Sequence, residues 1–495
     1  MGNDPSPNDS LKALGRVLLL VQFIASLVIM ALRVRTYSLE VNFGGYYQEF
    51  ALIGNGQIGL GGGYFGFPFF RSSGSFLFGL VSVIALVARS PLVLASIYVV
   101  LLSAINFLAF SYGTDLLRGS AKEQSHQLRY EAIVLMMVLL NPFFYLSLFG
   151  EFHFDLALSM VFGMLILKPS SGTKIPMRIV AIVALLVNGF YGGLILAFVG
   201  VARLLSLRFA KRIEAITEAI LGVLAMVVYS ALGFAKAIDF SIFISAYAPT
   251  LIPYGQSATY ASLGRFVASP KLILTSITSN LTSIIEVVLV GGGVGVLGVL
   301  GPLTAIILVV GASLFGVLPP LNEPLYGFGA SIFVFASSVK VLIAVTRMGR
   351  RVVSFSSILV ALSITVGLLL VASQAIGNTY YPISSVDRQP LTIAASYISD
   401  SSEVIGDPRL LGRFSGRSYV FSDLSASPIP ILSSSVYILV TTSPKVTFSN
   451  GYGIADVAPS DKFAKLSSLG IQLVYRGGDI ELFKLVAPLP KEITI

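Results

Sequence analysis

The apolar stretch 91–112, PLVLASIYVVLLSAINFLAFSY, decides the fold of this protein. It contains no charged residue, and about 20 such residues cross the roughly 30 Å of hydrocarbon in a bilayer as one helix. Similar stretches recur along the chain, although several are shorter. The candidate spans are 13–33, 91–112, 130–148, 156–168, 177–188, 191–205, 213–235, 280–298, 299–316, 327–346 and 353–375. The sequence therefore predicts a mainly α-helical, polytopic transmembrane bundle of about eleven spans.

The composition agrees with a membrane protein. The 495 residues are 55% hydrophobic and 12% charged, whereas soluble domains carry about 25% charged residues. The net charge of +9 does not indicate nucleic-acid binding, because the basic residues lie in short loops between the spans. The absence of cysteine excludes disulfides and thiolate metal sites, and two histidines are too few for a histidine-rich metal cage.

Lysine and arginine are concentrated in alternate loops, which predicts the orientation. Cytoplasmic loops of membrane proteins carry an excess of these residues. We therefore expect a multi-pass protein of the cell membrane with a cytoplasmic N-terminus and an extracytoplasmic C-terminal domain. The basic loops contain Arg118, Lys122, Arg129, Lys168, Lys174, Arg178, Arg203, Arg208, Lys211, Arg212, Arg347, Arg350 and Arg351.

The outer side has long segments that do not read as spans. The first, 36–90, is rich in Gly, Tyr and Phe and ends in the apolar stretch 75–88. That stretch is too short to span comfortably, which predicts a helix lying at the outer membrane interface. A second long segment, 236–279, contains another amphipathic stretch near 265–274.

The composition changes after Ala375, where short apolar runs alternate with polar residues. This pattern predicts a transmembrane domain over 1–376 and a small extracytoplasmic α/β domain over 377–495. The expected strands are 404–405, 418–421, 436–441, 471–475 and 480–484, with helices near 390–399 and 460–469 and a hairpin turn at 476–479.

Acidic residues near the outer span ends are the candidates for chemistry. Glu40 and Glu49 lie in the first outer loop, and Glu151, His153 and Asp155 lie in the second. Carboxylates and an imidazole at a span end can act as a general base or bind a divalent cation such as Mg or Mn. In a helical continuation, residues 151 and 155 would share a face. The structural alternative is that these acids only stabilise the start of a helix.

A second ambiguous feature is the glycine run at 291–301. Small residues at this spacing permit close helix packing. A broken helix that lines a transport path is the functional alternative. We favour packing.

Several short motifs occur along the chain in a characteristic order and spacing. They are Asn141-Pro-Phe-Phe-Tyr145, Glu151-Phe-His153, Pro319-Pro-Leu-Asn-Glu-Pro-Leu-Tyr326, Leu410-Leu-Gly-Arg-Phe-Ser-Gly-Arg417 and the ending Val474-Tyr-Arg-Gly-Gly-Asp-Ile-Glu-Leu-Phe-Lys484. In this order and spacing they resemble a family known only as a domain of unknown function within the GT-C glycosyltransferase superfamily. The resemblance covers nearly the whole chain. It implies a multispan transferase that takes a sugar from a polyprenyl-phosphate donor at the outer face.

The chain departs from the family pattern where the family carries acids. The family's first-loop Asp-Leu-Gly-Ile-Phe-Asp-Gln is Asn42-Phe-Gly-Gly-Tyr-Tyr-Gln48 here, and its Asp-Phe-His-Pro is Glu151-Phe-His-Phe154. A Lys-Glu-Asp motif is replaced by Asn188-Gly-Phe190. Either a neighbouring acid substitutes for the missing base, or the fold is kept without the activity.

The resemblance leads to three hypotheses. The first is a glycosyltransferase with Glu49 or Glu40 as the base and with Glu151, His153 and Asp155 contributing. Its expected substrate-binding residues are Gln48, Arg71, Tyr254 and Arg265, with Arg71 or Arg265 near the donor phosphate. The second is an inactive relative that binds a lipid-linked glycan or scaffolds a surface complex. The third is a transporter, which the lack of internal repeats and of buried charge pairs disfavours.

Overall fold

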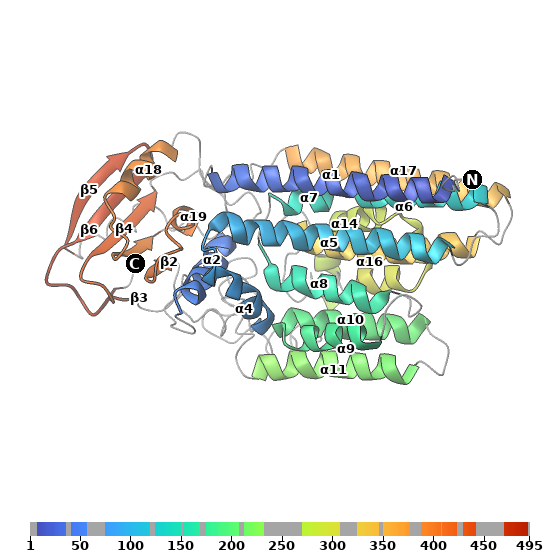
Figure 1. The fold of residues 1–495 in the computed structure, drawn as a ribbon, viewed down its shortest axis with the longest axis horizontal. Coiled ribbons are helices and arrows are strands. Elements are labelled where there is room, and N and C mark those ends of the chain that lie inside the picture. The colour runs from blue at the N-terminus through green and yellow to red at the C-terminus, as the bar shows by residue number, and fades with distance from the viewer. Residues whose placement is uncertain are drawn as a thin grey trace, which may run out of the picture.

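The structure is a computed structural model of the chain. It describes residues 7–35, 41–56, 75–118, 124–149, 152–168, 175–206, 212–231, 270–306, 324–345, 350–376, 388–406, 408–422, 429–441 and 470–493. A helical bundle occupies one part of the molecule, and a small sheet domain lies beyond one end of it (Figure 1).

The bundle is built from apolar helices, most of which run roughly along its long axis (Figure 1). They are α1 (Pro7–Arg35), α5 (Pro91–Arg118), α6 (Gln124–Leu139), α7 (Pro142–Ser147), α8 (Phe154–Leu167), α9 (Ile175–Leu186), α10 (Gly189–Ser206), α11 (Arg212–Ala231), α14 (Pro270–Val290), the 3-10 helix η3 (Val294–Leu297), α16 (Pro324–Val345) and α17 (Arg350–Ile376).

Five helices in the described residues are long and apolar enough to cross a membrane. They are Leu11–Arg35, Pro91–Leu117, Gln127–Ser147, Leu325–Val345 and Arg351–Ser373. Shorter apolar helices pack among them, including α8, α9 and α10. The prediction of a multi-pass membrane bundle is therefore confirmed, whereas the number of eleven spans stays a prediction.

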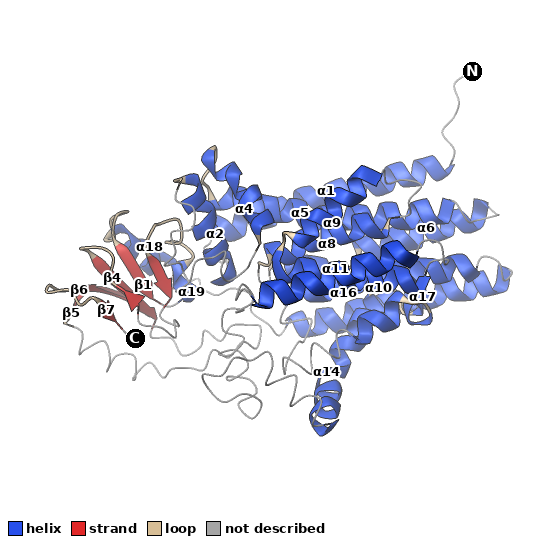
Figure 2. Ribbon diagram, turned by 90° about the horizontal axis from the view of Figure 1, so that it is seen from below, coloured by secondary structure: helices blue, strands red, loops and turns tan. Residues whose placement is uncertain are grey.

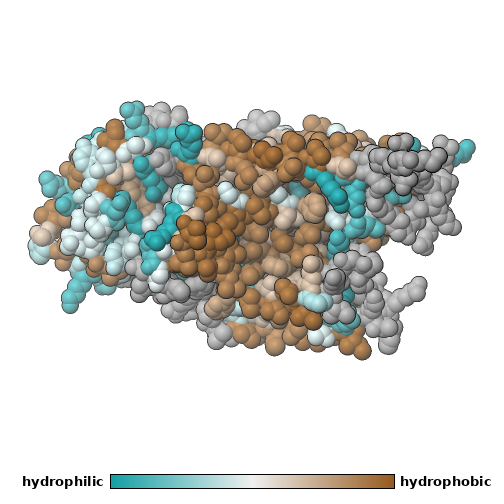
Figure 3. Space-filling view, viewed as in Figure 1, coloured by the Kyte–Doolittle hydropathy of each residue, from teal (hydrophilic) through white to brown (hydrophobic). Residues whose placement is uncertain are grey.

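The surface of the bundle is apolar where a bilayer would contact it. Val17, Leu20 and Val21 of α1 and Leu362 and Leu369 of α17 are all more than half exposed. Figure 3 shows hydrophobic residues over most of the bundle's visible face and mainly hydrophilic residues over the sheet domain. Exposed apolar side chains at this density are stable in contact with lipid and not with water.

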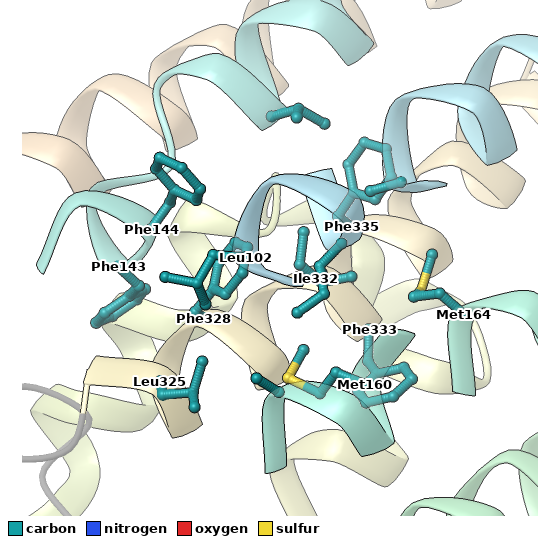
Figure 4. Packing of buried hydrophobic residues seen from close by; sticks show 14 of the residues in the cluster. Leu102, Phe143, Phe144, Met160, Met164, Leu325, Phe328, Ile332, Phe333 and Phe335 are labelled. Carbon is teal, nitrogen blue, oxygen red and sulfur yellow. The ribbon is translucent and has the colours of Figure 1, made fainter. Parts of the chain in front are cut away.

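The centre of the bundle is filled by large side chains from α5, α7, α8 and α16 (Figure 4). Phe143, Phe144 and Phe328 are fully buried there, and Met160 and Ile332 are each only 1% exposed. The core therefore joins helices that are distant in sequence, as dense packing of interiors requires.

Two predicted spans are interrupted, for local reasons. The span at 130–148 breaks after Leu139, where Asn141 caps α7 by accepting a hydrogen bond from the Phe143 N–H and Pro142 begins that helix. Proline favours a first helical turn because its missing N–H would have no partner there.

The second interruption lies inside the span predicted at 280–298, since α14 ends at Val290. Gly292 and Gly293 have φ of 97° and 64°, which other residues rarely adopt. A Cβ at Gly291 would lie 2.5 Å from Val334, and Ser338 donates a hydrogen bond to the Gly291 carbonyl at 2.6 Å. The glycines thus permit close packing against α16, as favoured from the sequence.

Three short helices lie at the end of the bundle that faces the sheet, called here the domain end. They are α2 (Val41–Gly54), α4 (Phe76–Ser82) and η1 (Val83–Leu86) (Figure 1). The last two cover the apolar stretch 75–88, which is helical and too short to span, as expected. Leu80, Ile84 and Val87 are exposed on it.

The C-terminal domain contains a five-stranded mixed sheet in the order β2-β1-β4-β6-β5 (Figure 2). Strands β1, β2 and β4 are parallel, and β6 pairs antiparallel with both β4 and β5. Helix α18 (Arg388–Ser396) contacts β5 and β6, and a two-stranded sheet pairs β3 with β7. The strands are β1 (Glu403–Gly406), β2 (Val420–Ser422), β3 (Ile429–Pro430), β4 (Val436–Thr441), β5 (Ile471–Gly477), β6 (Ile480–Leu485) and β7 (Glu492–Ile493).

The five predicted strands and the hairpin between β5 and β6 are confirmed, as is the helix near 390–399. The helix predicted at 460–469 lies outside the described residues. The short helix α19 (Pro408–Leu411) follows β1 and contacts α2, so the sheet domain touches the bundle's domain end.

The N-terminus and the sheet domain lie at opposite ends of the bundle (Figure 1). Helices α1 and α5 are antiparallel, because Lys12 contacts Asp115 and Gln22 contacts Asn106. The C-terminal ends of α5, α8 and α10 therefore lie at the same end of the bundle as the start of α1, and they carry Arg118, Lys168 and Arg203 of the predicted cytoplasmic set. The geometry agrees with that alternation, and the direction across the membrane stays a prediction.

Candidate functional site at the domain end

Helix α2 is buried on every side although it lies outside the spans. Its described side chains from Phe43 to Ile53 are all buried, including the polar residues Gln48 and Glu49. It contacts η1 and α4 on one side and α19 of the sheet domain on another. Helix α2 is therefore buried between the bundle and the C-terminal domain.

Tyr46 joins α2 to the start of α8. Its hydroxyl donates a hydrogen bond of 2.7 Å to Oδ1 of Asp155, and the same oxygen accepts the Leu156 N–H at 3.0 Å. Burial, and then the charge of Asp155, raise the pKa of Tyr46 well above its usual value, so the phenol stays protonated as the donor. Asp155 is thereby held at the N-terminus of a helix, where a negative charge is stabilised.

Asn188 is the second connection in this buried network. Its amide donates to the Asp155 carbonyl at 2.6 Å and to the Ser159 hydroxyl at 2.8 Å. Its side-chain oxygen accepts a hydrogen bond from Ser75, at the start of α4. The position where the family pattern has an acidic motif therefore ties α4, α8 and the turn before α10 together.

Glu49 lies three residues after Tyr46 and is its neighbour on the helix surface. Its side chain is only 5% exposed, and burial raises the pKa of its carboxyl from 4.5 to about 7. Among the described residues, no group hydrogen-bonds to its Oε1. A buried carboxyl that can both lose and accept a proton near neutral pH is suited to general-base chemistry.

Gln48 points instead toward the C-terminal domain. Its amide nitrogen lies 3.5 Å from the carbonyl oxygens of Arg417 and Val420. A Cβ added at Gly416 would lie 3.1 Å from the Tyr47 ring. The segment before β2 therefore packs directly on the helix that carries Glu49.

His153 precedes α8 and is partly exposed. Its ring lies 5.6 Å from the ring of Tyr326 and 6.5 Å from that of Tyr191, and the two tyrosine hydroxyls hydrogen-bond to each other. These residues come from the starts of α8, α10 and α16. They form an aromatic and hydroxyl-rich cluster at the domain end of the bundle.

Arg33 supplies a buried positive charge at the same end. Its side chain, in the last turn of α1, is 2% exposed and donates to the carbonyl of Leu148. The guanidinium lies 5.8 Å from the ring centre of Phe152, which in turn lies 4.7 Å from that of Phe43 on α2. Phe152, just before α8, and helix α2 therefore pack against each other, with the cation beside them.

The structure places four of the residues expected to form the site. Glu49 and Gln48 lie on α2, His153 lies before α8, and Asp155 lies in its first turn. Glu40, Arg71, Glu151, Tyr254 and Arg265 lie outside the described residues. The expected helical continuation from 151 to 155 is wrong, because α8 begins only at Phe154, with His153 as its N-cap residue.

Three participants were not singled out from the sequence as site residues, namely Tyr46, Arg33 and Tyr326. Arg33 had a usable signal, because a cation at the outer end of the first span breaks the expected charge distribution. Tyr46 and Tyr326 lie within stretches that align with family motifs. Their hydrogen-bond partners, however, are more than 100 residues away in sequence, so the sequence does not reveal these contacts.

The described residues contain no group of three or more His, Asp or Glu side chains that could hold a metal ion. Asp155 already accepts two hydrogen bonds in the network. The described residues therefore give no support to the candidate Mg or Mn site. Such a site would need Glu40 or Glu151, which lie outside the described residues.

Comparison with known proteins gives one structural similarity. No family model matches the sequence, and no curated protein matches it. ArnT from Cupriavidus metallidurans, solved with undecaprenyl phosphate bound, is similar over 95% of this chain and 98% of that chain, with 13% identity and a TM-score of 0.39.

Proposed function

We propose that this protein is a membrane glycosyltransferase of the GT-C type, which moves a sugar from a polyprenyl-phosphate donor to an extracytoplasmic acceptor. The observation that carries the proposal is the buried Glu49 carboxyl, whose pKa is about 7. It lies on helix α2, and Phe43 of that helix packs on the Phe152 ring beside the Arg33 guanidinium. The order of family-like motifs in the sequence supports the same reaction class.

The chemistry needs a base and a cation at one place. Glu49 takes the proton from the acceptor hydroxyl as its oxygen attacks the anomeric carbon of the sugar. The bond between that carbon and the phosphate oxygen breaks, and the lipid phosphate leaves with the bonding electrons. Arg33 offsets the charge that develops on the phosphate, an effect that is large in a site screened from water.

Arg33 is a further candidate for binding the donor phosphate, in addition to Arg71 and Arg265, which lie outside the described residues. Its guanidinium presents several N–H donors, and a planar cation of this kind binds phosphate oxygens in pairs. The partly buried Tyr191 and Tyr326 next to His153 supply hydroxyls and ring faces suited to contact with a sugar.

The test is a transfer assay on the purified protein with labelled polyprenyl-phosphate sugars. We expect Glu49→Gln to lower turnover about 10²–10⁴-fold, the usual effect of losing a general base. Below pH 7 the turnover of the native protein should fall about tenfold per pH unit, because Glu49 must be ionised to act. Glu214→Gln, an exposed acid at the other end of the bundle, is the matched control.

A second candidate function is a non-catalytic relative that binds a lipid-linked glycan. It is favoured by the network around Asp155 and Asn188, where residues at or near family acidic motifs hold the fold together. Donor binding without turnover, unaffected by Glu49→Gln, would establish this function and contradict the transferase.

A further inference from the structure

A second charged cluster lies at the opposite end of the bundle from the candidate site. Lys12 of α1 and Lys168 at the end of α8 both contact Asp115 of α5, each with a nitrogen–oxygen distance of 3.2 Å. Lys168 also donates to the Ser111 hydroxyl at 3.0 Å. One carboxylate thus holds two ammonium groups, and the cluster keeps a net charge of +1.

Each of the two ammonium groups has an N–H donor that no described residue accepts. Each ammonium carries three N–H donors, of which Lys12 uses one and Lys168 two within the described residues. The lysine side chains are 18% and 22% exposed, and Asp115 is 35% exposed. They are therefore held in place and are still accessible at the membrane boundary.

The helix face below the cluster suits an acyl chain. Phe107, Ser111 and Asp115 are spaced four apart on α5, so they lie along one stripe of the helix. Phe107 is 46% exposed and lies about 12 Å deeper along the axis than Asp115, from a rise of about 1.5 Å per residue. A hydrophilic patch borders the hydrophobic face at this end of the bundle (Figure 3).

We propose that Lys12 and Lys168 bind the phosphate of an anionic glycerophospholipid in the leaflet at the N-terminal end, with its acyl chain against Phe107. Asp115 holds the two ammonium groups at a common distance and leaves one net positive charge for the phosphate. A zwitterionic headgroup gains less at the same place, because its own ammonium is repelled by the lysines.

A second ion-pair cluster at the same end provides a contrast. Arg178 and Arg203 pair there with Glu218 and Glu214, so two positive charges meet two negative charges. These four charges cancel one another, so they attract an anionic headgroup less than Lys12 and Lys168 do. Ile220 on α11 is 59% exposed. It lies eight residues, or about 12 Å, from the start of that helix at the same end of the bundle, which makes it a reference position.

The absence of tryptophan makes a direct test available. Phe107→Trp or Ile220→Trp gives a protein with a single tryptophan, which is placed in phosphatidylcholine vesicles. Quenching of its fluorescence is then compared between brominated phosphatidylglycerol and brominated phosphatidylcholine at equal fractions. In the Phe107→Trp protein we expect phosphatidylglycerol to associate about fivefold more strongly than phosphatidylcholine, from about 1 kcal/mol per net cation. In the Ile220→Trp protein we expect a smaller preference for phosphatidylglycerol than in the Phe107→Trp protein.

Two charge variants, each made in the Phe107→Trp protein, test whether the lysine charges cause the lipid preference. Lys12→Gln with Lys168→Gln should remove the lipid preference, whereas Asp115→Asn should increase it, because two uncompensated cations remain. Misfolding would weaken the lipid preference in both variants, so a decrease in one and an increase in the other indicates an effect on binding. Size-exclusion chromatography checks that both variants are folded. Equal quenching by both lipids, or a preference that survives the loss of both lysines, would overturn the proposal.

Competition identifies the source of the phosphate. Excess unbrominated phosphatidylglycerol should restore the fluorescence of the Phe107→Trp protein, and inorganic phosphate should not. Restoration by a trace of polyprenyl phosphate, well below the phosphatidylglycerol fraction, would overturn the assignment to a glycerophospholipid. Transfer activity is not part of the readout, so failure here leaves the proposed function standing.

Discussion

Glu49 illustrates how burial changes the chemistry of one carboxyl group. Removal from water disfavours the ionised form, so the pKa rises to about 7 without any charged neighbour as the main cause. The same burial costs the folded state free energy at any pH where the group is ionised. Catalysis and stability therefore make opposite demands on this residue.

The stability effect can be measured. The pKa of Glu49 is higher in the folded than in the unfolded protein, so the protonated carboxyl does not lower the free energy of unfolding. Stability is therefore lost as the pH rises from 4.5 through about 7, where the buried group ionises. We expect Glu49→Gln to stabilise the protein by up to about 3 kcal/mol at pH 8 and by little at pH 4.5, from the shift in pKa. Thermal unfolding at both pH values checks this. An equal effect at the two pH values would show that the carboxyl is not buried as described.

The environments of Asp155 and Glu49 could be predicted only in part from the sequence. Asp155 and Glu49 were identified as candidates because acids near span ends are expensive and therefore informative. Their different environments could not be read from the sequence. Asp155 accepts a hydrogen bond from a residue 109 positions away, whereas Oε1 of Glu49 accepts none from the described residues.

At the scale of elements, α2 is the least predictable part of the molecule. Its sequence, with three glycines and several aromatics, reads as a loop, and only its tertiary contacts explain a helix that is buried all round. Apolar periodicity cannot reveal such a helix, because no polar face remains to mark an outside. The longer spans were predictable because the thickness of the bilayer sets their length.

Helices α10 and α11 are joined through glycine faces, which gives a prediction about packing. A Cβ at Gly222 would lie 2.3 Å from the backbone nitrogen of Ala197, and one at Gly200 would lie 2.4 Å from that of Ala219. Backbone atoms cannot move aside as a flexible side chain can. We expect Gly222→Val to destabilise the bundle by about 2–3 kcal/mol or more, since overpacking forces the helices apart.

The matched control for this packing test is Leu224→Val on the same helix. Leu224 is 55% exposed, so the change alters only a side chain on the outer surface. Thermal stability in detergent, followed by size-exclusion chromatography, should separate the two variants. If both behave like the native protein, the close approach of α10 and α11 is not present.

At the scale of the whole molecule, the two ends of the bundle have different characters. The domain end carries the buried network, the candidate base and the sheet domain, and the opposite end carries most of the described ion pairs. The sequence anticipated this division from the basic loops. It did not anticipate that the C-terminal domain packs on α2, and that contact makes the domain part of the site's wall.

The orientation across the membrane is the last prediction, and the absence of cysteine makes it directly testable. Arg351 is exposed at the start of α17, at the N-terminal end, and Lys491 is exposed on the sheet domain. Because positive residues favour the cytoplasmic side, Lys491→Cys should react with a membrane-impermeant maleimide in intact cells. Arg351→Cys should react only after permeabilisation. The reverse pattern would place the sheet domain and Glu49 in the cytoplasm, and an extracytoplasmic transfer reaction would then be ruled out.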